Sequence, residues 1–259
     1  MLYSGIDVGA QSVKAVIFGG DKILGRKVLV TEEGAEAAAR KVYHELLEDL
    51  GIRPEEVERI FATGCMAGEL SFAERRTSEE VCAARGSRWL FPTARTVVDV
   101  GAEGCRVMKL GAGGVIEDFA NNSKCASGTG SFIELGAIYL KVALEEMGPL
   151  SLSADGFAEV SSTCAVFAES VIISNIHKGE SRARIAAGIH RAVATRVVEL
   201  IGRVGLVEDV VMVGGGALNS GLIRSLEELT GTSFRIPDHP RTVAALGAAI
   251  QASRKKKER

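Results

Sequence analysis

The chain has 259 residues, of which 46% are hydrophobic and 25% are charged, with a formal net charge of −2. This size and composition are typical of a soluble globular protein with one large domain or two lobes. The charge gives no electrostatic argument for a nucleic-acid partner, and no apolar run reaches the roughly 18 residues of a membrane span. Met1 leads directly into a strand pattern and not into a signal peptide, so we expect a cytoplasmic protein.

The first part of the chain alternates short apolar segments with helical patterns. The expected strands lie at 2–8, 13–18, 26–31 and 58–63. The expected helices lie at 33–50, which is rich in Ala, Glu and Leu, and at 78–86. Each strand is bounded by residues that favour turns.

The same kind of pattern restarts near residue 95. The expected strands lie at 95–100, 105–110, 114–119, 209–213 and 233–236. The expected helices lie at 129–147, 165–177, 182–204, 219–230 and 241–254. This order of strands and helices predicts an α/β fold.

One short motif occurs at the end of the first strand of each half. It is Asp7-Val8-Gly9-Ala10 in the first half and Asp99-Val100-Gly101-Ala102 in the second, each time between two apolar strands. We interpret this repeat as two similar lobes that face one another across a cleft. The expected first lobe covers 1–94 plus the C-terminal helix at about 240–259, and the second covers 95–239.

The motif at Asp7 has the features of a phosphate-binding turn. Gly9 allows a tight hairpin whose N–H groups can point at phosphate oxygens. Ser12 could add a hydroxyl group and Lys14 a positive charge. The alternative for Asp7 is an Asx-type turn that caps the hairpin. The sequence contains neither GxxxxGK[ST] nor GxGxxG, so it has neither a Walker A loop nor a dinucleotide signature.

A glycine-rich segment follows a late apolar strand. Residues 210–213 run into Gly214-Gly215-Gly216 and then into a helical pattern that starts near Asn219. The three glycines leave bare backbone against which a flat or bulky ligand could lie. A close-packed turn from strand to helix is the alternative.

Two of the five cysteines lie in segments of small residues that lead into predicted helices. Cys125 lies in 121–130 and Cys164 in 161–170, so each sulfur is expected at or near a helix N-terminus. There the helix dipole and the unbonded N–H groups favour a thiolate. Two thiolates fall short of the four that an iron–sulfur or zinc site needs. The sequence therefore points to a site shared by two copies of the chain.

These segments, in this order, resemble the superfamily of two-lobed nucleotide-binding proteins that includes acetate kinase, sugar kinases, heat-shock chaperone ATPases and actin. The resemblance implies an actin-like fold of duplicated ribonuclease-H-like lobes with a nucleotide in the cleft between them. The segments 124–130 and 161–170 resemble, more narrowly, the activator ATPases of 2-hydroxyacyl-CoA dehydratases. Relatives in ATP-dependent benzoyl-CoA reductase and in double-cubane-cluster reductases share the pattern.

The narrower resemblance implies a homodimer with one [4Fe-4S] cluster at the subunit interface, held by Cys125 and Cys164 of each chain. Such proteins use ATP to pass single low-potential electrons from a ferredoxin or flavodoxin to a partner enzyme in anaerobic metabolism. The expected partners are therefore a second copy of the chain, a cluster-containing dehydratase or reductase, and an electron-donor protein.

The resemblance also implies roles in a site for ATP and Mg²⁺. Asp7 and Asp99 would hold the hydrated cation, and Lys14 would neutralise phosphate charge. The residues expected to cradle the phosphates are Gly9, Ala10, Gln11, Ser12, Gly101 and Ala102. The residues expected to contact the adenosine are Gly214, Gly215, Gly216 and Asn219.

The chain departs from the family's second phosphate segment, which usually contains Gly-Gly-Gln-Asp after the strand, where this sequence has Gly101-Ala102-Glu103-Gly104. Here Glu103 replaces the amide, and Gly104 removes the carboxylate. A negative Glu103 would repel a γ-phosphate unless Mg²⁺ or Lys14 offsets its charge or Glu103 positions the attacking water. Glu103 therefore joins Asp7 and Asp99 as a catalytic candidate.

Three other interpretations stay open at this point. The chain could be a small-molecule kinase in which Cys125 and Cys164 are merely packed, or a nucleotide-dependent regulator that no longer hydrolyses ATP. A shared zinc site would also suit four thiolates. The remaining cysteines are Cys65, Cys82 and Cys105, of which Cys105 is expected to be a small core residue.

Overall fold

The computed structural model describes residues 1–31, 34–68, 70–122, 128–160 and 165–254. The chain divides into two compact units, and each is described by itself. Unit 1 comprises Met1–Ala94, Gly111–Ile116 and Asp238–Arg259, and unit 2 comprises Arg95–Leu110 and Glu117–Pro237. No helix in the described part of the chain is long and apolar enough to cross a membrane.

Unit 1 is built on a five-stranded sheet in the order β3-β2-β1-β4-β5. The strands are β1 (Leu2–Val8), β2 (Ser12–Gly19), β3 (Lys22–Val30), β4 (Val57–Thr63) and β5 (Arg75–Arg76). The first three strands are antiparallel neighbours, whereas β4 pairs in parallel with β1 and β5 with β4. The strand β5 was not predicted from the sequence, because a two-residue strand carries no alternation of apolar and polar residues.

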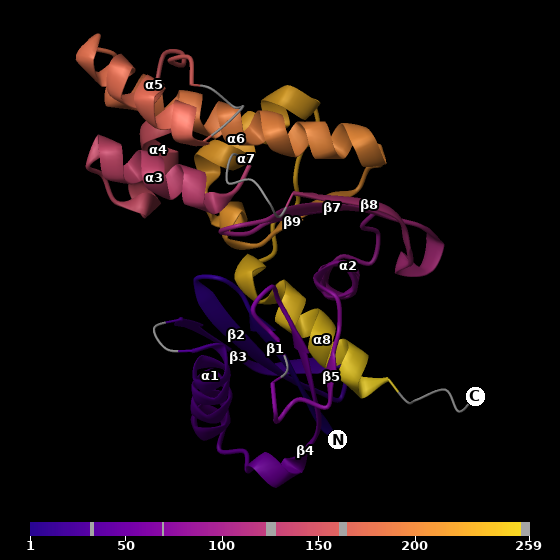
Figure 1. The fold of residues 1–259 in the computed structure, drawn as a ribbon. Coiled ribbons are helices and arrows are strands. Elements are labelled where there is room, and N and C mark those ends of the chain that lie inside the picture. Colours follow the sequence, from indigo (N-terminus) through magenta and orange to yellow (C-terminus); the bar gives the residue numbers. More distant parts are fainter. Residues whose placement is uncertain (32–33, 69, 123–127, 161–164, 255–259) are drawn as a thin grey trace. The chain divides into compact units, whose positions relative to one another are not determined.

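Helices cover both faces of this sheet (Figure 1). Side chains alternate along β2, so Val13 and Ile17 pack with α1 (Ala35–Leu50), whereas Val16 and Phe18 pack with α8 (Val243–Ser253). Because both faces of the sheet are covered, nearly all residues of β2 are apolar, and polar residues do not alternate with apolar ones along the strand.

The helix α8 also packs against α2 (Glu79–Leu90) at very short range. A Cβ atom on Gly247 would overlap the Cys82 carbonyl oxygen, and one on Gly5 would overlap the Ala245 carbonyl oxygen. Glycine at these two positions therefore lets the α8 backbone approach both α2 and β1. The small-residue face of this helix, centred on residues 244–249, serves that close packing.

Unit 2 repeats the arrangement with a four-stranded sheet in the order β8-β7-β6-β9. The strands are β6 (Thr96–Val100), β7 (Cys105–Leu110), β8 (Ile116–Asn122) and β9 (Val210–Val213). As in unit 1, the central hairpin β6–β7 is antiparallel, and the strand on the other side of β6 is parallel. The predicted strand at 233–236 is reduced to a single bridge between Arg235 and Val211.

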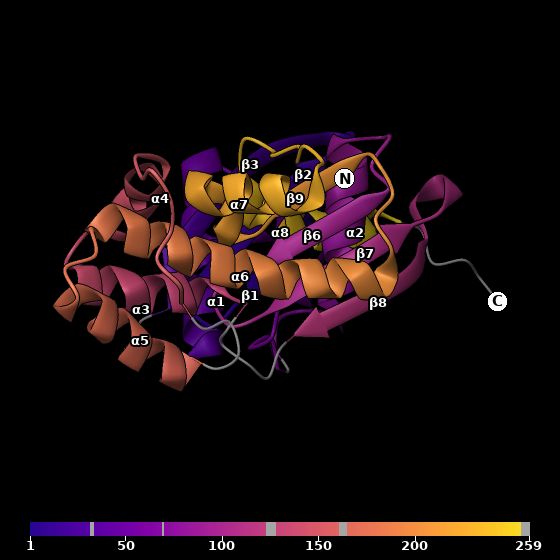
Figure 2. The same ribbon diagram turned by 90° about the horizontal axis from the view of Figure 1, so that it is seen from above.

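Five helices accompany the second sheet. They are α3 (Gly130–Leu140), α4 (Leu144–Leu152), α5 (Ala165–His177), α6 (Arg182–Val204) and α7 (Ser220–Thr230). The 23-residue α6 is the centre of this unit's core and packs against α3, α4, α5, α7 and β7. Figure 2 shows α6 as the long helix with α7 beside it.

The prediction of a single helix at 129–147 was wrong. The chain leaves α3 at Lys141, which has a left-handed backbone (φ 53°), and starts α4 three residues later. The N–H group of Ala143 donates to the Glu146 carboxylate (2.9 Å), which fixes the start of α4. Lys141 is an unusual residue for a left-handed cap, so local sequence gave no stop signal.

Candidate functional site

The first phosphate-binding candidate is the β1–β2 hairpin of unit 1. Asp7 at the end of β1 lies opposite Lys14 in β2, and the Lys14 Nζ atom is 3.2 Å from Asp7 Oδ2. Nζ also donates to the Ser12 carbonyl (3.1 Å), and the Gly9 N–H group donates to the same carbonyl (3.1 Å). The Asp7 side chain is 11% exposed, so this ion pair is largely shielded from water and holds the turn in one geometry.

The β6–β7 hairpin of unit 2 has the same construction. Asp99 lies opposite Arg106, and the Arg106 Nη1 atom is 3.6 Å from Asp99 Oδ2. The Gly101 N–H group donates to the Gly104 carbonyl (2.7 Å), as Gly9 does to Ser12 in unit 1. In both hairpins the basic residue follows the aspartate by seven positions.

In each unit a glycine at the end of the neighbouring parallel strand lies beside the aspartate of the hairpin. Gly64 follows β4 with φ 106°, and Gly214 follows β9 with φ 85°. A Cβ atom on Gly64 would lie 2.6 Å from Asp7 Oδ1, and one on Gly214 would lie 2.5 Å from Asp99 Oδ1. Each would also overlap the carbonyl oxygen of the valine after the aspartate, Val8 or Val100. Glycine is therefore required in both places.

This donor set suits a nucleotide with a hydrated divalent cation. Each hairpin offers a carboxylate for the cation's water ligands and a glycine-containing turn with backbone N–H groups, and Lys14 adds a positive charge for the phosphates. In the described residues no cluster of three or more His, Cys, Asp or Glu side chains could hold a bare metal ion.

Glu103 lies at the tip of the second turn and is exposed. The carbonyl oxygens of the two residues before Glu103 accept hydrogen bonds from another segment: Gly101 accepts from the Gly130 N–H group and Ala102 from the Ser131 N–H group (both 2.9 Å). The turn is therefore joined to the N-terminus of α3.

The three consecutive glycines differ in what requires them. Gly214 lies beside Asp99, and a Cβ atom on Gly216 would come within 2.7 Å of the Val100 side chain. Gly215 is exposed, and a Cβ atom there would meet nothing within 4 Å. The close-packed turn that the sequence left as an alternative thus accounts for two of the glycines, and Gly215 offers bare backbone to a ligand. Asn219 caps α7, accepting the Leu222 N–H group (3.0 Å).

The cysteines fall into two groups. Cys125 and Cys164, the predicted cluster ligands, lie outside the described residues. Among the others, Cys65 is exposed, whereas Cys82 and Cys105 are buried. Burial raises the pKa of Cys82 to about 12 and also raises the pKa of Cys105, so both thiols stay protonated. Cys105 is the small core residue that the sequence predicted.

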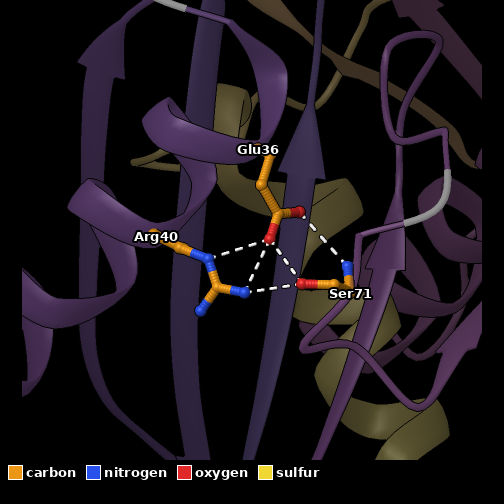
Figure 3. A network of polar contacts seen from close by, with 3 residues as sticks. All are labelled: Glu36, Arg40 and Ser71. Carbon is orange, nitrogen blue, oxygen red and sulfur yellow. Dashed lines mark hydrogen bonds and ion pairs between the residues drawn. The ribbon is translucent and has the colours of Figure 1, made fainter.

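The segment after Gly64 is fixed at both ends. The Met66 N–H group donates to the Val8 carbonyl (2.9 Å), directly behind Asp7. Farther along, Ser71 donates its hydroxyl (2.7 Å) and its N–H group (3.2 Å) to Glu36, which also accepts from Arg40 Nε (2.8 Å; Figure 3). The Ser71 hydroxyl is the main cause of a lowered pKa of Glu36. This network ties the segment to α1.

Sequence reasoning missed two residues of the site. Arg106 is the counterpart of Lys14, and Gly64 is the counterpart of Gly214. The signal for Arg106 was available, because it stands 92 positions after Lys14 just as Asp99 stands 92 positions after Asp7. The signal for Gly64 lay only in strand pairing, which the sequence does not display.

Comparison with known proteins decides the family. A family model described as the BadF/BadG/BcrA/BcrD ATPase family matches residues 4–252. The chain belongs to this family. It is therefore an ATPase, and the resemblance drawn from the cysteine segments is confirmed.

Relatives match over almost their whole length. The chain is 40% identical over 249 residues to the activator of lactoyl-CoA dehydratase of Anaerotignum propionicum, covering 96% of both chains. It is 36% identical over 259 residues to the 2-hydroxyisocaproyl-CoA dehydratase activator of Clostridioides difficile, covering 100% of this chain and 97% of the relative.

Solved structures of dehydratase activators also match this chain over nearly its whole length. The activator of the 2-hydroxyisocaproyl-CoA dehydratase with bound ADPNP matches with a TM-score of 0.91, covering 97% of this chain and 94% of that chain at 36% identity. Component A of the (R)-2-hydroxyglutaryl-CoA dehydratase of Acidaminococcus fermentans matches with a TM-score of 0.93 at 35% identity, covering 97% of both. A ROK hexokinase from Thermus thermophilus, with a TM-score of 0.55 and 16% identity over 97% of this chain and 98% of that chain, shares the fold alone. The predicted α/β, actin-like fold is thus confirmed.

Proposed function

We propose that this ATPase is an electron-transfer activator of a partner 2-hydroxyacyl-CoA dehydratase or of a related reductase. ATP hydrolysis is coupled to the delivery of one low-potential electron at a time from a ferredoxin or flavodoxin. The single observation that carries the proposal is the match, over nearly the whole chain, to dehydratase activators at 36–40% identity.

The two hairpins supply the nucleotide-binding part of this function. Asp7 and Asp99 bind water ligands of Mg²⁺, and Lys14 offsets the charge of the phosphates. The turn at Gly9, with the neighbouring residues up to Ser12, and the turn at Gly101 cradle the phosphate oxygens. The shielding of both ion pairs supports this assignment, because charged groups held in place need little reorganisation when phosphate binds.

The exposed backbone at Gly215 packs against the adenosine, and Asn219 lies beside the adenosine. The side-chain oxygen Oδ1 of Asn219 accepts the capping hydrogen bond of α7. The Nδ2 amino group is therefore the part of this side chain that faces a ribose or base. The ADPNP in the structure of the C. difficile relative supports a nucleotide at a site of this kind.

Cys125 and Cys164 from each of two chains hold one [4Fe-4S] cluster in a homodimer. When bound, the cluster supplies one-electron chemistry. Each chain contributes two of the four thiolates and the helices α3 and α5 that follow them in the sequence, since Cys125 precedes α3 by five residues and Cys164 immediately precedes α5. Helix N-termini near the thiolates favour their deprotonated form.

Protein purified without oxygen tests this function. We expect a dimer with about two iron and two sulfide per chain, no zinc, and a visible absorption that bleaches in air. The Cys125→Ala variant should lose the iron and the ability to drive a partner dehydratase, and the Cys105→Ala variant should keep both. A monomeric, metal-free protein, or a Cys125→Ala variant that keeps its iron and its activator activity, would contradict the proposal.

A further inference from the structure

The Arg106 side chain occupies a junction within unit 2. Its guanidinium lies 3.6 Å from Asp99 Oδ2, and only 9% of the side chain is exposed. A Cβ atom on Gly104 would lie 3.6 Å from Nη2 and 3.7 Å from Nη1, so the guanidinium packs directly against the turn from Gly101 to Gly104. The same point above Gly104 is 3.6 Å from the Asn122 carbonyl oxygen, which places the end of β8 at this junction too.

The other side of the turn holds the start of α3. This helix has no side-chain cap at Thr129, and the carbonyls of Gly101 and Ala102 accept from the first N–H groups of the helix, those of Gly130 and Ser131. The orphan donors at the helix N-terminus are thus satisfied by the phosphate-binding turn itself. A displacement of this turn must either move the helix start or break these two hydrogen bonds.

Both attachments flank one stretch of sequence. Asn122, next to Gly104, precedes the segment with Cys125, and Gly130, bonded to Gly101, follows it. The described ends of that stretch also lie near each other, since a Cβ atom on Gly128 would be 3.3 Å from Asn122 Nδ2. The hairpin that carries Asp99 is therefore in contact with the residues on both sides of the Cys125 segment.

We propose that Arg106 is the positioning residue of this junction, and that it holds Asp99, the Gly101–Gly104 turn and the start of α3 in one arrangement that responds to the bound nucleotide. This inference rests on the proposed nucleotide site and adds the route by which that site acts on the Cys125 region. A buried guanidinium suits the role because its planar fork can hold a carboxylate while it packs under the turn. Unit 1 uses Lys14 at the equivalent position, where, among the described residues, Met66 and Thr31 and not a helix start donate to the carbonyls of the hairpin.

The test compares Arg106→Gln and Arg106→Lys with Lys109→Gln, which removes a charge three residues along the same strand. The first readout is ATP hydrolysis. Arg106→Gln should lower kcat about tenfold or more while KM for ATP·Mg²⁺ changes little, because the nucleotide still binds but Asp99 is misplaced. Arg106→Lys should recover most of the rate, since lysine serves this purpose in unit 1. Lys109→Gln should behave like the unaltered protein.

The second readout is hydrogen exchange of the N–H groups at the start of α3, followed in peptides from 128–140. The unaltered protein should exchange there at different rates with ADP and with a non-hydrolysable ATP analogue. In Arg106→Gln the two rates should become equal, and in Arg106→Lys and Lys109→Gln the difference should persist. An unchanged kcat in Arg106→Gln, or an exchange difference that survives in that variant, overturns the inference.

The outcome is separable from that of the proposed function. The exchange experiment needs no iron, so a metal-free protein would refute the electron-transfer role while the role of Arg106 is still measured. If Arg106→Gln fails to fold, Arg106→Lys decides. A lysine variant that folds and keeps both most of the hydrolysis rate and the nucleotide-dependent exchange difference supports the inference, and one that has lost the exchange difference overturns it. One that is inactive with normal exchange overturns the inference.

Discussion

The two hairpins of this protein have nearly the same construction and different attachments. Asp7 and Lys14 in unit 1 correspond to Asp99 and Arg106 in unit 2, and each pair is shielded from water. In unit 1 the Val8 and Gln11 carbonyls accept from the N–H groups of Met66 and Thr31, whereas in unit 2 the Gly101 and Ala102 carbonyls accept from the start of α3. The two copies of the hairpin therefore share an ion pair and a turn but are tied to different neighbouring segments.

The largest expected effect comes from neutralising the two carboxylates. Asp7→Asn and Asp99→Asn should each lower kcat for ATP hydrolysis by about a thousandfold, since each removes a preorganised charge from the site. Steady-state hydrolysis at saturating Mg²⁺ measures this, with Asp21→Asn on a surface turn as control. If only one of the two substitutions slows hydrolysis, the two hairpins are not functional equivalents.

The matched glycines give a comparison of stability. Gly64→Ala and Gly214→Ala should each lower the free energy of unfolding by about 4 kcal/mol, because alanine is strained at positive φ and its methyl group would overlap a valine carbonyl. Urea denaturation measures the loss. The control is Gly215→Ala, which should leave stability unchanged and raise only KM for ATP. Stable Gly64→Ala protein would show that the neighbourhood of Asp7 can relax.

Lowering the pH should destabilise unit 2 more than unit 1, because the buried His190 lies in unit 2, whereas His44, His177 and His239 are exposed. Burial lowers the pKa of His190 to about 4, against about 6.5 in an unfolded chain. Its neutral form stabilises the fold fully above pH 6.5, and this stabilisation, up to about 3 kcal/mol, is lost as the pH falls from 6.5 to 4.

The measurement is the free energy of unfolding of the protein and of His190→Leu across that pH range. The leucine variant should show a shallower decline, and the exposed His177→Gln should show the original one. Parallel curves for the protein and His190→Leu would mean that another group controls the acid sensitivity.

The smallest expected effect concerns the turn tips, where Gln11 in unit 1 corresponds to Glu103 in unit 2. Glu103→Gln should lower KM for ATP about threefold by removing a charge that repels phosphate, and Gln11→Glu should raise it by a similar factor. Both changes should shrink at high salt because exposed charges are screened. If Glu103→Gln instead lowers kcat, Glu103 positions the attacking water.

Local chemistry made much of this molecule predictable. The hairpins could be predicted because an aspartate at the end of an apolar strand, before a glycine turn and a second strand, is a short-range pattern. Most helices and strands also follow from their periodicity. The break at Lys141 could not be predicted, because lysine has no preference for a left-handed backbone and the helix end is closed by backbone hydrogen bonds to the Ala137 and Ile138 carbonyls.

The repeated aspartate motif was predicted in both halves, but the packing of a glycine against each aspartate was not. The contact of Gly64 with Asp7 and of Gly214 with Asp99 arises from parallel pairing of strands that are far apart in the sequence. The bonds from Gly130 and Ser131 to the second turn are equally long-range. Such contacts depend on the order of strands in the sheet, which the pattern of residues along the chain does not reveal.

The close packing of α8 has a consequence for how the chain matures on the ribosome. Val16 and Phe18 in β2 are buried against Ala245 and Leu246, which are translated more than 220 residues later. Until α8 leaves the exit tunnel, this side of the N-terminal sheet lacks the α8 side chains that complete its packing beside Trp89 and Leu90. Unit 2, whose buried core residues in the described part of the chain lie within 98–234, can complete its packing first.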